Sequence, residues 1–531
     1  MRNLELPGRS TVHSKNGMAA TSHTLSTLTA ISVLQNNGNA MDAAIAACAV
    51  QCVVEPQSTG IGGDCFCIFS PEGSTELVAF NGSGKAPKAA TYEWYQNNQI
   101  SEIKRQSPHA VTVPGAVDGW EQLLKSHGTK ELGELLQPAI TLAEEGYSIS
   151  PRVSVDWSKQ IPLLLKDNNA KKRFLPFGRA PKVGETHHQP ELAKTLRSIA
   201  KHGKQAFYSG EVAEDIVNYL QSLGGLHTLE DFKNAAGTYV TPIKTNFRGH
   251  DIYECPPNGQ GVIALLLLNI ASKFPPHDKN PISTHRLHME IEAGKLAYQD
   301  RNTFVADPSK SDVPVNWLLS DDHATELFNH INPEYAMHNL PKASMPNHDD
   351  TVYITVIDKK RNACSFINTL FNAFGSCQLA PKSGVMLQNR GQGFVIEKSH
   401  PNCIGPNKRP MHTIIPGMVT KNNKVQMSFG VMGGHYQSFG HMHFLTKHFD
   451  FGLDMQEAMD LPRIFPIPGT KQVEIESGLP IEIIAGLKAK GHSLIPASRP
   501  IGGAQAISID WENGTLTGAS EPRKDGCAIG Y

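Results

Sequence analysis

The sequence predicts an α+β fold, in which paired strands and separate helices share one chain of 531 residues. Two apolar runs, TVYITVI at 351–357 and ACSFINTLF at 363–371, flank the polar turn DKKRN, which is the pattern of a β-hairpin. Residues 130–250 contain three helix-like segments, ELLQPAITLAEEG, PELAKTLRSIA and GEVAEDIVNYLQSLGG. A strand, a Gly-Gly turn and a long helix follow at 427–452. Together these patterns indicate the α+β class.

The first 120 residues are predicted to form strands and helices joined by glycine-rich turns. An Ala-rich helix is expected at about 40–54, where small side chains permit close packing. The glycines of EPQSTGIGG at 55–63 form a tight loop before an alternating strand. Their spacing matches neither GxGxxG nor GxxxxGK[ST], so no nucleotide site is predicted. A further strand and loop are expected at 77–87, and VTVPGAVDGW at 111–120 opens a helix.

The middle of the chain is predicted to be scaffold. In HTLEDF, Thr228 and Asp231 have the spacing of a capping box at a helix start. We expect the adjacent His187 and His188 to be solvated surface residues rather than a metal pair.

The stretch before the predicted hairpin holds two more helices and a long loop. DIYECPPNGQG at 251–261 predicts a strand and turn, followed by the buried helix VIALLLLNIASKF, and residues 284–300 predict another helix. Residues 305–350 are polar, rich in Pro, Asn, Asp and His, and lack periodicity, so we predict one long mobile loop there.

The last third of the chain is predicted to alternate strands with loops. SGVMLQNRGQGF at 383–394 reads as a strand and loop, 400–418 as a Pro-rich loop entering a strand, and the chain ends in two strands and a tail. Gly433 and Gly434 lie where a strand meets a helix. Backbone amides at such a turn suit an oxyanion hole, although a simple tight turn has the same pattern.

Four histidines crowd the helix after this glycine pair: His435, His441, His443 and His448. A metal site is conceivable because His441 and His448 lie two turns apart. No carboxylate or Cys completes a ligand set in the sequence, so we predict surface or core histidines and no metal. No cofactor signature is found elsewhere.

The composition of the chain limits the classes of binding partner and the cellular compartment that we expect. The formal net charge is −1 and no basic run occurs, which argues against nucleic acid or an anionic membrane surface as main partner. The longest apolar stretches, 43–54 and 262–271, are too short to span a bilayer. The N-terminus lacks an apolar signal core, and nine scattered Cys fit a reducing compartment, so we expect a cytoplasmic protein.

Thr351 is the leading candidate for a catalytic nucleophile. It follows Asp349 and Asp350 and opens the first hairpin strand. If the chain were cut after Asp350, Thr351 would carry a free α-amine, and this amine could accept the proton of the Thr351 hydroxyl. The ordinary alternative is a Thr that merely suits a strand start.

The segment DTVYITVID–KRNACSFINTLF–FGS resembles the start of the small subunit in the γ-glutamyltranspeptidase family. Other pieces resemble that family in order, from TGIGG to the C-terminal PRKDG run, so the likeness covers nearly the whole chain. The resemblance implies an N-terminal-nucleophile hydrolase with a four-layer αββα sandwich. It also implies autocleavage between Asp350 and Thr351 into a large subunit, 1–350, and a small subunit, 351–531, that stay together.

The resemblance assigns catalytic roles by position. Thr351 would be the nucleophile and its α-amine the base, and Thr369 would hydrogen-bond the nucleophile. Gly433 and Gly434 would form the oxyanion hole.

The sequence departs from the family in the substrate pocket. The arginine that grips the substrate α-carboxylate in γ-glutamyl-cleaving relatives is missing from the loop FNGSGK at 80–85. Phe371 replaces an Asn, Arg390 and Gly393 replace residues that read the α-amino group, and His412 with Thr413 replaces a Ser pair.

These departures resemble the acylase-like and oxamate amidohydrolase-like branch. Arg390, His412, Thr413 and Phe371 would then bind an acyl group that carries a carboxylate and no amine. The alternative for Arg390 is an ion pair with a protein carboxylate. The substrate would be a small-molecule amide, and assembly into a homo-oligomer is left open.

Two alternative functions remain at this point. One is γ-glutamyl hydrolase or transferase action on glutathione and related compounds. The other is a non-catalytic homologue that keeps the fold and never cleaves itself.

Overall fold

The computed structural model describes residue 5 and residues 8–274, 279–337 and 351–531. Two seven-stranded sheets form its centre, and neighbouring strands within each sheet are antiparallel. The first sheet has the order β1 (Val12–Ser14), β18 (Thr515–Ser520), β17 (Gly503–Asp510), β13 (Lys424–Met432), β12 (Gly417–Lys421), β9 (His250–Glu254), β8 (Ile243–Phe247). The second has the order β19 (Cys527–Gly530), β2 (Met18–Thr21), β10 (Val352–Ile357), β11 (Ala363–Thr369), β3 (Asp64–Ser70), β4 (Val78–Gly82), β7 (Thr238–Val240).

The two sheets pack face to face, and the alternation of side chains along β10 shows how. Tyr353 and Ile357 belong to an apolar cluster that contains residues of both sheets, including Met418 of β12. Ile354 and Val356 point the other way and join a cluster with the helices. Successive side chains of a strand face opposite sides, so a strand with both faces covered must be apolar throughout.

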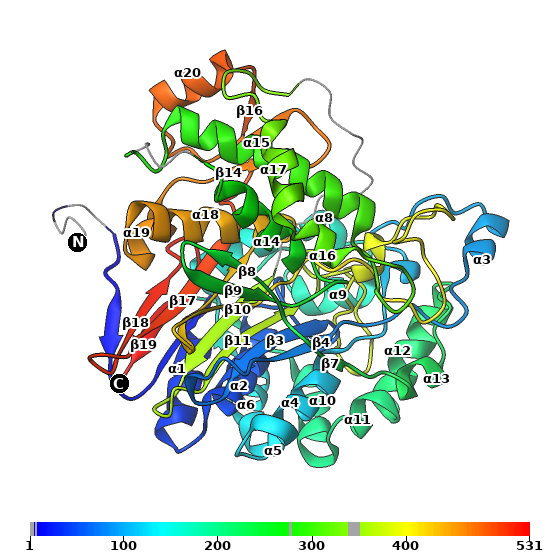
Figure 1. The fold of residues 1–531 in the computed structure, drawn as a ribbon. Helices are drawn as coiled ribbons and strands as arrows, with labels where there is room; N and C mark the ends of the chain where they lie inside the picture. The colour runs from blue at the N-terminus through cyan, green and yellow to red at the C-terminus, as the bar shows by residue number, and fades with distance from the viewer. Residues whose placement is uncertain (1–4, 6–7, 275–278, 338–350) are drawn as a thin grey trace.

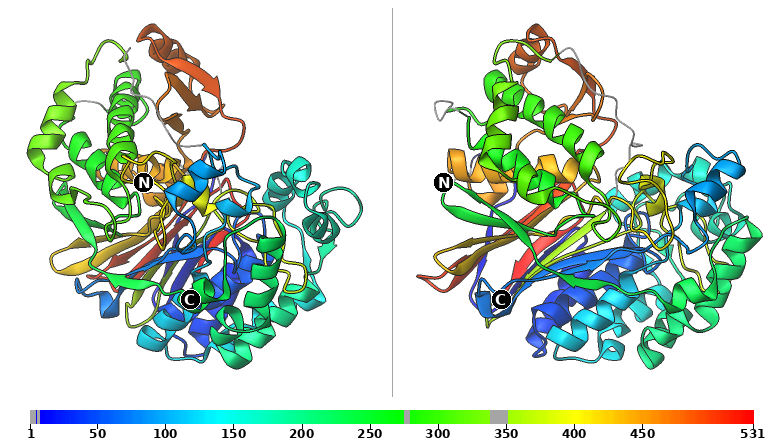
Figure 2. Two further views of the ribbon diagram at one scale, coloured as in Figure 1. Left: turned by 90° about the vertical axis from the view of Figure 1, so that its right-hand side faces the viewer. Right: turned by 45° about the vertical axis from the view of Figure 1, so that its right-hand side comes forward.

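Helices cover the outer face of each sheet (Figures 1 and 2). Below the second sheet, α2 (Ala40–Val54) contacts β10 and β11, next to α1 (Thr24–Gln35), α4 (Ala116–His127) and α6 (Gln137–Glu145). On the first sheet lie α14 (Gly261–Ala271) and α18 (Tyr436–Phe451), and the longer α15 (Thr284–Phe304) packs against α14. The order helix, sheet, sheet, helix confirms the four-layer αββα sandwich within the α+β class.

The remaining elements surround this sandwich. A small three-stranded sheet, β14 (Ile464–Pro466), β15 (Gln472–Ile475) and β16 (Ser493–Pro496), carries α20 (Ile481–Ala489) and packs near α15. The other α-helices are α3 (Tyr92–Asn97), α5 (Leu132–Leu135), α7 (Pro151–Ser158), α8 (Ile161–Leu164), α9 (Asn168–Phe174), α10 (Pro190–His202), α11 (Gln205–Tyr208), α12 (Glu211–Ser222), α13 (Leu229–Lys233), α16 (Val315–Leu318), α17 (Asp321–Asn329), α19 (Met455–Asp460). A two-stranded ribbon is formed by β5 (Tyr147–Ser148) and β6 (Thr186–His187).

Several predicted elements are confirmed. The Ala-rich helix spans Ala40–Val54, and every residue in it is buried. The hairpin is formed by β10 and β11, with Val352 opposite Asn368. The capping box at Thr228 and Asp231 is present at the start of α13.

Other predictions are wrong in part. The stretch 305–337 is not one loop, because α16 and α17 form within it, and Ser320 caps α17 by accepting from the His323 amide. Residues 338–350 of that predicted loop lie outside the described residues. The segment 383–394 forms turns and a short 3₁₀ helix, Arg390–Gly393, rather than a strand.

One residue of the histidine pair and the C-terminus also differ from expectation, whereas His188 is exposed as predicted. His187 is buried, with its ring stacked on Phe174 and edge-on to Trp157, so it is a core residue. The C-terminal region forms three strands rather than two, since β19 follows β17 and β18 and joins the second sheet. Within the described ranges, we find no helix with both the length and the apolar character that a bilayer crossing requires.

Candidate active site

Thr351 lies immediately before β10, in the middle of the second sheet, and is 1 % exposed. Its Oγ lies 3.4 Å from Oγ of Thr369, the last residue of β11. The hairpin register pairs Val352 with Asn368, so it brings the residues one step further out beside each other. The hairpin therefore brings together two threonines that are eighteen residues apart in the sequence.

Two further groups orient the Thr351 hydroxyl. The amide of Phe371 donates to Thr369 Oγ at 2.8 Å, which holds Thr369 beside Thr351, and either threonine hydroxyl can be the donor between them. Gln437, in the first turn of α18, donates its Nε2–H to Thr351 Oγ at 3.3 Å. Its own Oε1 accepts from the Ile415 amide at 3.2 Å, which fixes the orientation of the carboxamide.

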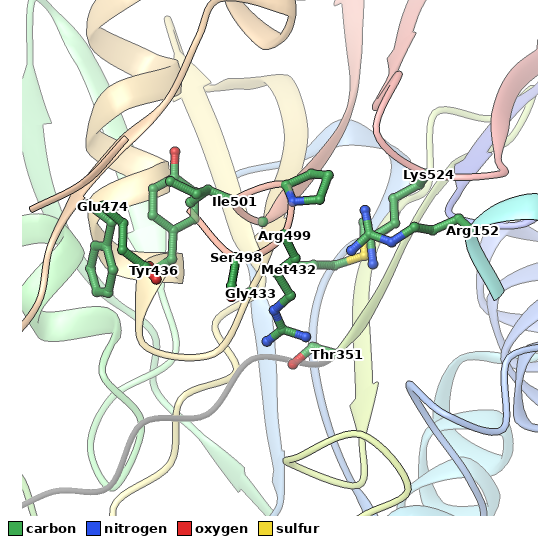
Figure 3. Close-up of a pocket in the computed structure, with 13 residues that line it drawn as sticks. Arg152, Thr351, Met432, Gly433, Tyr436, Glu474, Ser498, Arg499, Ile501 and Lys524 are labelled. Atoms are coloured by element: carbon green, nitrogen blue, oxygen red, sulfur yellow. The ribbon is translucent and has the colours of Figure 1, made fainter. Parts of the chain in front are cut away.

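Gly433 and Gly434 form the turn between β13 and α18, with φ angles of +121° and +57°. A Cβ on Gly433 would lie 2.8 Å from the Cα of Gly502, so no side chain fits there. Gly433 lines the same cavity as Thr351 (Figure 3). The carbonyl of Gly434 accepts from Gln260 Nε2 at 2.9 Å, which anchors the turn to the start of α14.

Arg390 is completely buried close to this site. Its guanidinium carbon lies 3.7 Å from the centre of the Phe371 ring, and its Nη1 donates to Thr413 Oγ at 3.0 Å. Among the described residues, Nε and Nη2 have no hydrogen-bond partner and no carboxylate forms an ion pair with Arg390. Burial lowers the pKa of Arg390 to about 9, against a smaller opposing effect of Asp64. The alternative for Arg390, an ion pair with a protein carboxylate, is thus not seen in the described part of the chain.

The His412 side chain is buried and contacts Asp64. Its Nε2 lies 3.1 Å from Asp64 Oδ2, and its Nδ1 accepts from the Ile414 amide at 3.3 Å. Burial, followed by the charge of Arg390, lowers the pKa of His412 to about 4, so the ring is neutral at pH 7. The neutral ring can donate Nε2–H to Asp64, the carboxylate whose charge opposes the effect of burial on Arg390.

Asp64 is held in place by three other donors. Its Oδ1 accepts from the amides of Gly84 and Gly115 at 2.9 and 3.2 Å and from Gln388 Nε2 at 2.9 Å. Both oxygens of this buried carboxylate are therefore occupied. Lys85, the cation of the neighbouring loop, instead lines a separate cavity of about 420 Å³ that does not include Thr351.

Sequence reasoning missed Gln437 and Asp64. Gln437 is the second residue of α18, close after the Gly433–Gly434 turn, so it lies in the helix turn nearest to the site. Asp64 is a charged residue that opens the buried strand β3 directly after a glycine loop. These sequence positions were the available signals for a functional role. Only the tertiary structure, however, shows that Gln437 and Asp64 lie at the site.

The histidines of α18 are structural. His441 Nδ1 lies 2.6 Å from Glu254, a carboxylate that the sequence pattern did not reveal, and its Nε2 accepts from the Val431 amide. Within the described residues, the one His and acid cluster of metal-binding size is His288, Glu292 and His492, which does not include Thr351. His435, His441 and His443 are buried and His448 is partly buried, which agrees with the prediction of surface or core histidines.

Known proteins resemble this chain along its whole length. The model of the family described as Gamma-glutamyltranspeptidase matches residues 26–531. A glutathione hydrolase-like proenzyme of Bacillus subtilis is 36% identical over 522 residues, covering 97% of this chain and 98% of the relative. An oxamate amidohydrolase proenzyme of Klebsiella pneumoniae is 31% identical over 538 residues, covering 98% of this chain and 100% of the relative.

A solved structure is similarly close. The crystal structure of a cephalosporin acylase from Bacillus halodurans has a TM-score of 0.93 at 38% identity, covering 100% of this chain and 99% of that chain. The resemblance first seen in the hairpin is therefore confirmed in sequence and in fold. The chain belongs to the γ-glutamyltranspeptidase family and is an N-terminal-nucleophile hydrolase that acts on amide bonds.

Proposed function

We propose that this enzyme hydrolyses amides whose acyl group carries a carboxylate, with Thr351 as nucleophile. The observation that carries the proposal is Arg390, a buried cation with two N–H groups that no described residue accepts. Leaving a buried donor without a partner costs ~1–3 kcal/mol, and more for a charged group. A substrate carboxylate would supply acceptors and countercharge at once.

Processing would use the same hydroxyl as catalysis. Thr351 Oγ attacks the carbonyl carbon of Asp350, and the peptide nitrogen becomes the free α-amine as the acyl group moves to oxygen. Water then hydrolyses the ester, which gives subunits 1–350 and 351–531 that remain together. Asp350 lies outside the described residues, so support comes from Thr351, whose hydroxyl is buried and oriented by Thr369 and Gln437.

In turnover, Thr351 Oγ attacks the substrate carbonyl and its α-amine accepts the hydroxyl proton. The amides of Gly433 and Gly434 would stabilise the tetrahedral oxyanion, since they lie at the N-terminus of the 16-residue helix α18. The α-amine passes the proton to the departing amine, and water then releases the acyl group. We expect no cofactor or metal in these steps.

The acyl side of the site is defined by a continuous chain of contacts. Thr369 touches Thr351, the Phe371 amide holds Thr369, and the Phe371 ring stacks on Arg390. Arg390 in turn donates to Thr413. His412 and Thr413 would lie beside the acyl carboxylate, with His412 holding Asp64 as a partial countercharge.

The test compares two chromogenic amides that differ only in an amine. We expect glutaryl-p-nitroanilide to exceed γ-glutamyl-p-nitroanilide in kcat/KM by at least ~10-fold, because the ammonium of the latter is repelled by Arg390. Arg390→Gln should remove this preference, while Arg179→Gln, which changes a surface ion pair with Glu185, should keep it. Equal turnover of both amides by the wild-type enzyme would refute the proposal.

The second candidate is γ-glutamyl hydrolysis or transfer, favoured by the names of relatives such as the glutathione hydrolase-like proenzyme. The same substrate pair decides between the two. A non-catalytic homologue is disfavoured because Thr351, Thr369 and the glycine turn are all in place. We also propose a cytoplasmic location, supported by nine free thiols, eight of them buried, and we leave the oligomeric state open.

A further inference from the structure

One buried glutamine, Gln260, contacts both halves of the proposed active site. It lies directly before α14, a helix that packs against α15 and α18 (Figure 1). Its Nε2 donates to the carbonyl of Thr413 and to the carbonyl of Gly434, both at 2.9 Å. Thr413 belongs to the acyl side, where its Oγ accepts from Arg390, and Gly434 belongs to the turn of the proposed oxyanion hole. A single carboxamide therefore joins the acyl side to this turn.

The orientation of this carboxamide follows from the chemistry of its partners. Both partners of Nε2 are carbonyl oxygens, which only accept, and the partner of Oε1 is Nη1 of Arg301, which only donates, at 3.1 Å. The backbone of Gln260 is bonded as well, because its amide donates to the His412 carbonyl at 2.9 Å and its carbonyl accepts from the Ser438 hydroxyl at 3.0 Å. Every polar atom of Gln260 thus has a partner, and the side chain is fixed in one orientation.

Helix α15 supports the carboxamide from behind. Arg301 of this helix is 1 % exposed, and its Nη1 donates both to Gln260 Oε1 and to Nδ1 of His435, the latter at 2.7 Å. Burial lowers the pKa of Arg301 to about 10, so the side chain is still a cation at pH 7. Tyr298, one helix turn earlier, donates to the carbonyl of His435. The residue that follows the glycine turn is therefore held through its ring and through its backbone.

Gln260 differs in this respect from Gln437, the other glutamine at the site. Gln437 accepts from the Ile415 amide and donates to Thr351 Oγ, so it touches the nucleophile. The two hydrogens of Gln260 Nε2 are both donated to backbone carbonyls, which leaves none for the nucleophile or for a substrate. The effect of Gln260 on the reaction must therefore act through the geometry of the backbone that it holds.

The relative placement of the acyl side and the glycine turn matters for the rate of acylation. Donors of an oxyanion hole act over a narrow range of distances, about 2.7–3.1 Å from the developing oxyanion. Binding of a remote carboxylate accelerates the chemical step only when the same bound geometry also brings the carbonyl to these donors. A side chain that fixes Thr413 relative to Gly434 makes the two requirements compatible.

We propose that Gln260 is a positioning residue that allows an acyl carboxylate bound at Arg390 to accelerate the acylation of Thr351. The inference rests on the proposed function and adds a specificity-determining residue that does not itself contact the substrate. Without the two donors of Gln260, the carboxylate still binds at Arg390, but this binding no longer places the acyl carbonyl against the amides of Gly433 and Gly434. The advantage of a carboxylate-bearing acyl group then remains in binding and disappears from the chemical step.

The experiment compares two anilides that differ only at the far end of the acyl chain. Glutaryl-p-nitroanilide carries a carboxylate where pentanoyl-p-nitroanilide carries a methyl group, and both release p-nitroaniline. Stopped-flow measurement of a single turnover, with the processed enzyme in excess, gives the acylation rate constant and the apparent dissociation constant of each substrate separately. For the wild-type enzyme we expect the acylation rate constant to be at least ~10-fold higher with the glutaryl compound.

Gln260→Met keeps the length of the side chain and removes both donors. We expect the ratio of the two acylation rate constants to fall to within about 3-fold of unity, and the ratio of the two dissociation constants to stay within about 3-fold of its wild-type value. A general loss of packing would instead slow both substrates and leave the ratio of rate constants unchanged. The matched control is Gln189→Met, because Gln189 is also buried and donates to a backbone carbonyl, that of Val53, at 2.7 Å. This control should keep both wild-type ratios.

A second variant covers the case in which Gln260→Met is not cut after Asp350. Arg301→Met leaves Gln260 in place and removes the donor that holds its Oε1, so the ratio of acylation rate constants should fall at least ~3-fold. A wild-type ratio of rate constants in Gln260→Met, or in Arg301→Met where only that variant is processed, overturns the inference.

The wild-type measurement separates this inference from the proposed function. If the glutaryl compound is favoured only through a lower dissociation constant, the proposed acyl specificity stands and the role of Gln260 is overturned. If the wild-type enzyme distinguishes the two anilides in neither constant, the proposed acyl specificity itself fails, and the inference that rests on it fails with it.

Discussion

At the scale of single residues, the Thr351 hydroxyl is defined by groups that come from three separate segments. Thr369 belongs to the partner strand, Gln437 to the start of α18, and the Phe371 amide fixes Thr369. Thr351 and Thr369 could be predicted because the hairpin segment resembles the start of the small subunit in the γ-glutamyltranspeptidase family. Gln437 could not, because its contact joins residues 86 positions apart.

Thr369→Val tests the hydrogen bond to the nucleophile. The valine keeps the shape and removes the hydroxyl, so we expect autocleavage and kcat/KM to fall by ~10- to 100-fold, the effect of one hydrogen bond to a reacting group. Thr369→Ser, which restores the hydroxyl, should recover most of the rate. Wild-type cleavage and turnover in the valine variant would show that Thr369 has no part in orienting Thr351.

At the scale of secondary-structure elements, the β13–α18 connection decides the geometry of the site. The sequence showed a strand, two glycines and a helix, and the structure shows why glycine is required there. Gly433 has φ +121°, and the backbone of Gly502 approaches it too closely for a Cβ. In contrast, helices α16 and α17 were missed, although Ser320 followed by two aspartates is a helix start signal.

Gly433→Ala should disrupt the turn and the amides that it presents. We expect a loss of at least ~100-fold in kcat/KM and a destabilisation of ~1–3 kcal/mol, from a strained φ and the contact with Gly502. The control is Gly452→Ala at the other end of α18, where φ is +67° and no atom lies within 4 Å of the new Cβ. The control should lose ~1 kcal/mol of stability and keep its activity. An active Gly433→Ala enzyme would rule out the oxyanion role.

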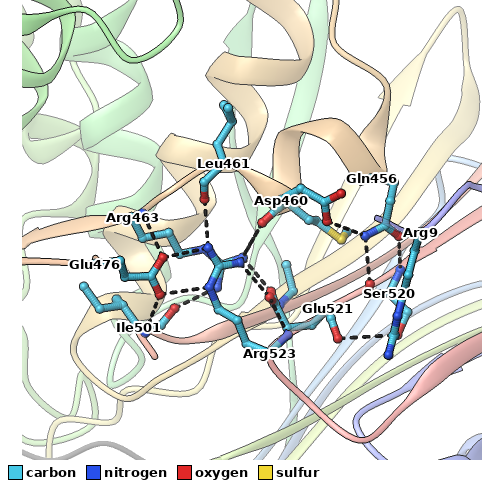
Figure 4. Close-up of polar contacts among 12 residues, drawn as sticks. Arg9, Gln456, Asp460, Leu461, Arg463, Glu476, Ile501, Ser520, Glu521 and Arg523 are labelled. Atoms are coloured by element: carbon cyan, nitrogen blue, oxygen red, sulfur yellow. Dashed lines mark hydrogen bonds and ion pairs between the residues drawn. The ribbon is translucent and has the colours of Figure 1, made fainter. Parts of the chain in front are cut away.

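At the scale of the whole molecule, the four-layer order could be anticipated from the family resemblance, but the charge network at the C-terminus could not. Burial alone would raise the pKa of Glu521, but Arg463 and Arg523 outweigh it and lower the pKa to about 2. These three residues join β14, the end of β18 and the C-terminal turn, segments that only tertiary packing brings together (Figure 4).

The network predicts a pH dependence of stability. Because the pKa of Glu521 is lower in the folded chain, its ionised form stabilises the fold above about pH 4.5, and this contribution is lost as the pH falls toward 2. Melting temperatures of wild type and Glu521→Gln should differ at pH 7 and converge in acid. Glu512→Gln, on the exposed β17–β18 turn, should follow the wild type throughout. A pH-independent difference for Glu521→Gln would contradict the assignment.

The central claim is that Thr351 becomes the N-terminal nucleophile of a small subunit. A denaturing gel with intact-mass analysis of wild type beside Thr351→Ala tests it most directly. We predict that the 57.9 kDa chain divides into fragments of about two-thirds and one-third, the smaller beginning at Thr351, and that the variant stays uncut. A single band in both proteins, or the same two fragments in the variant, would contradict the claim.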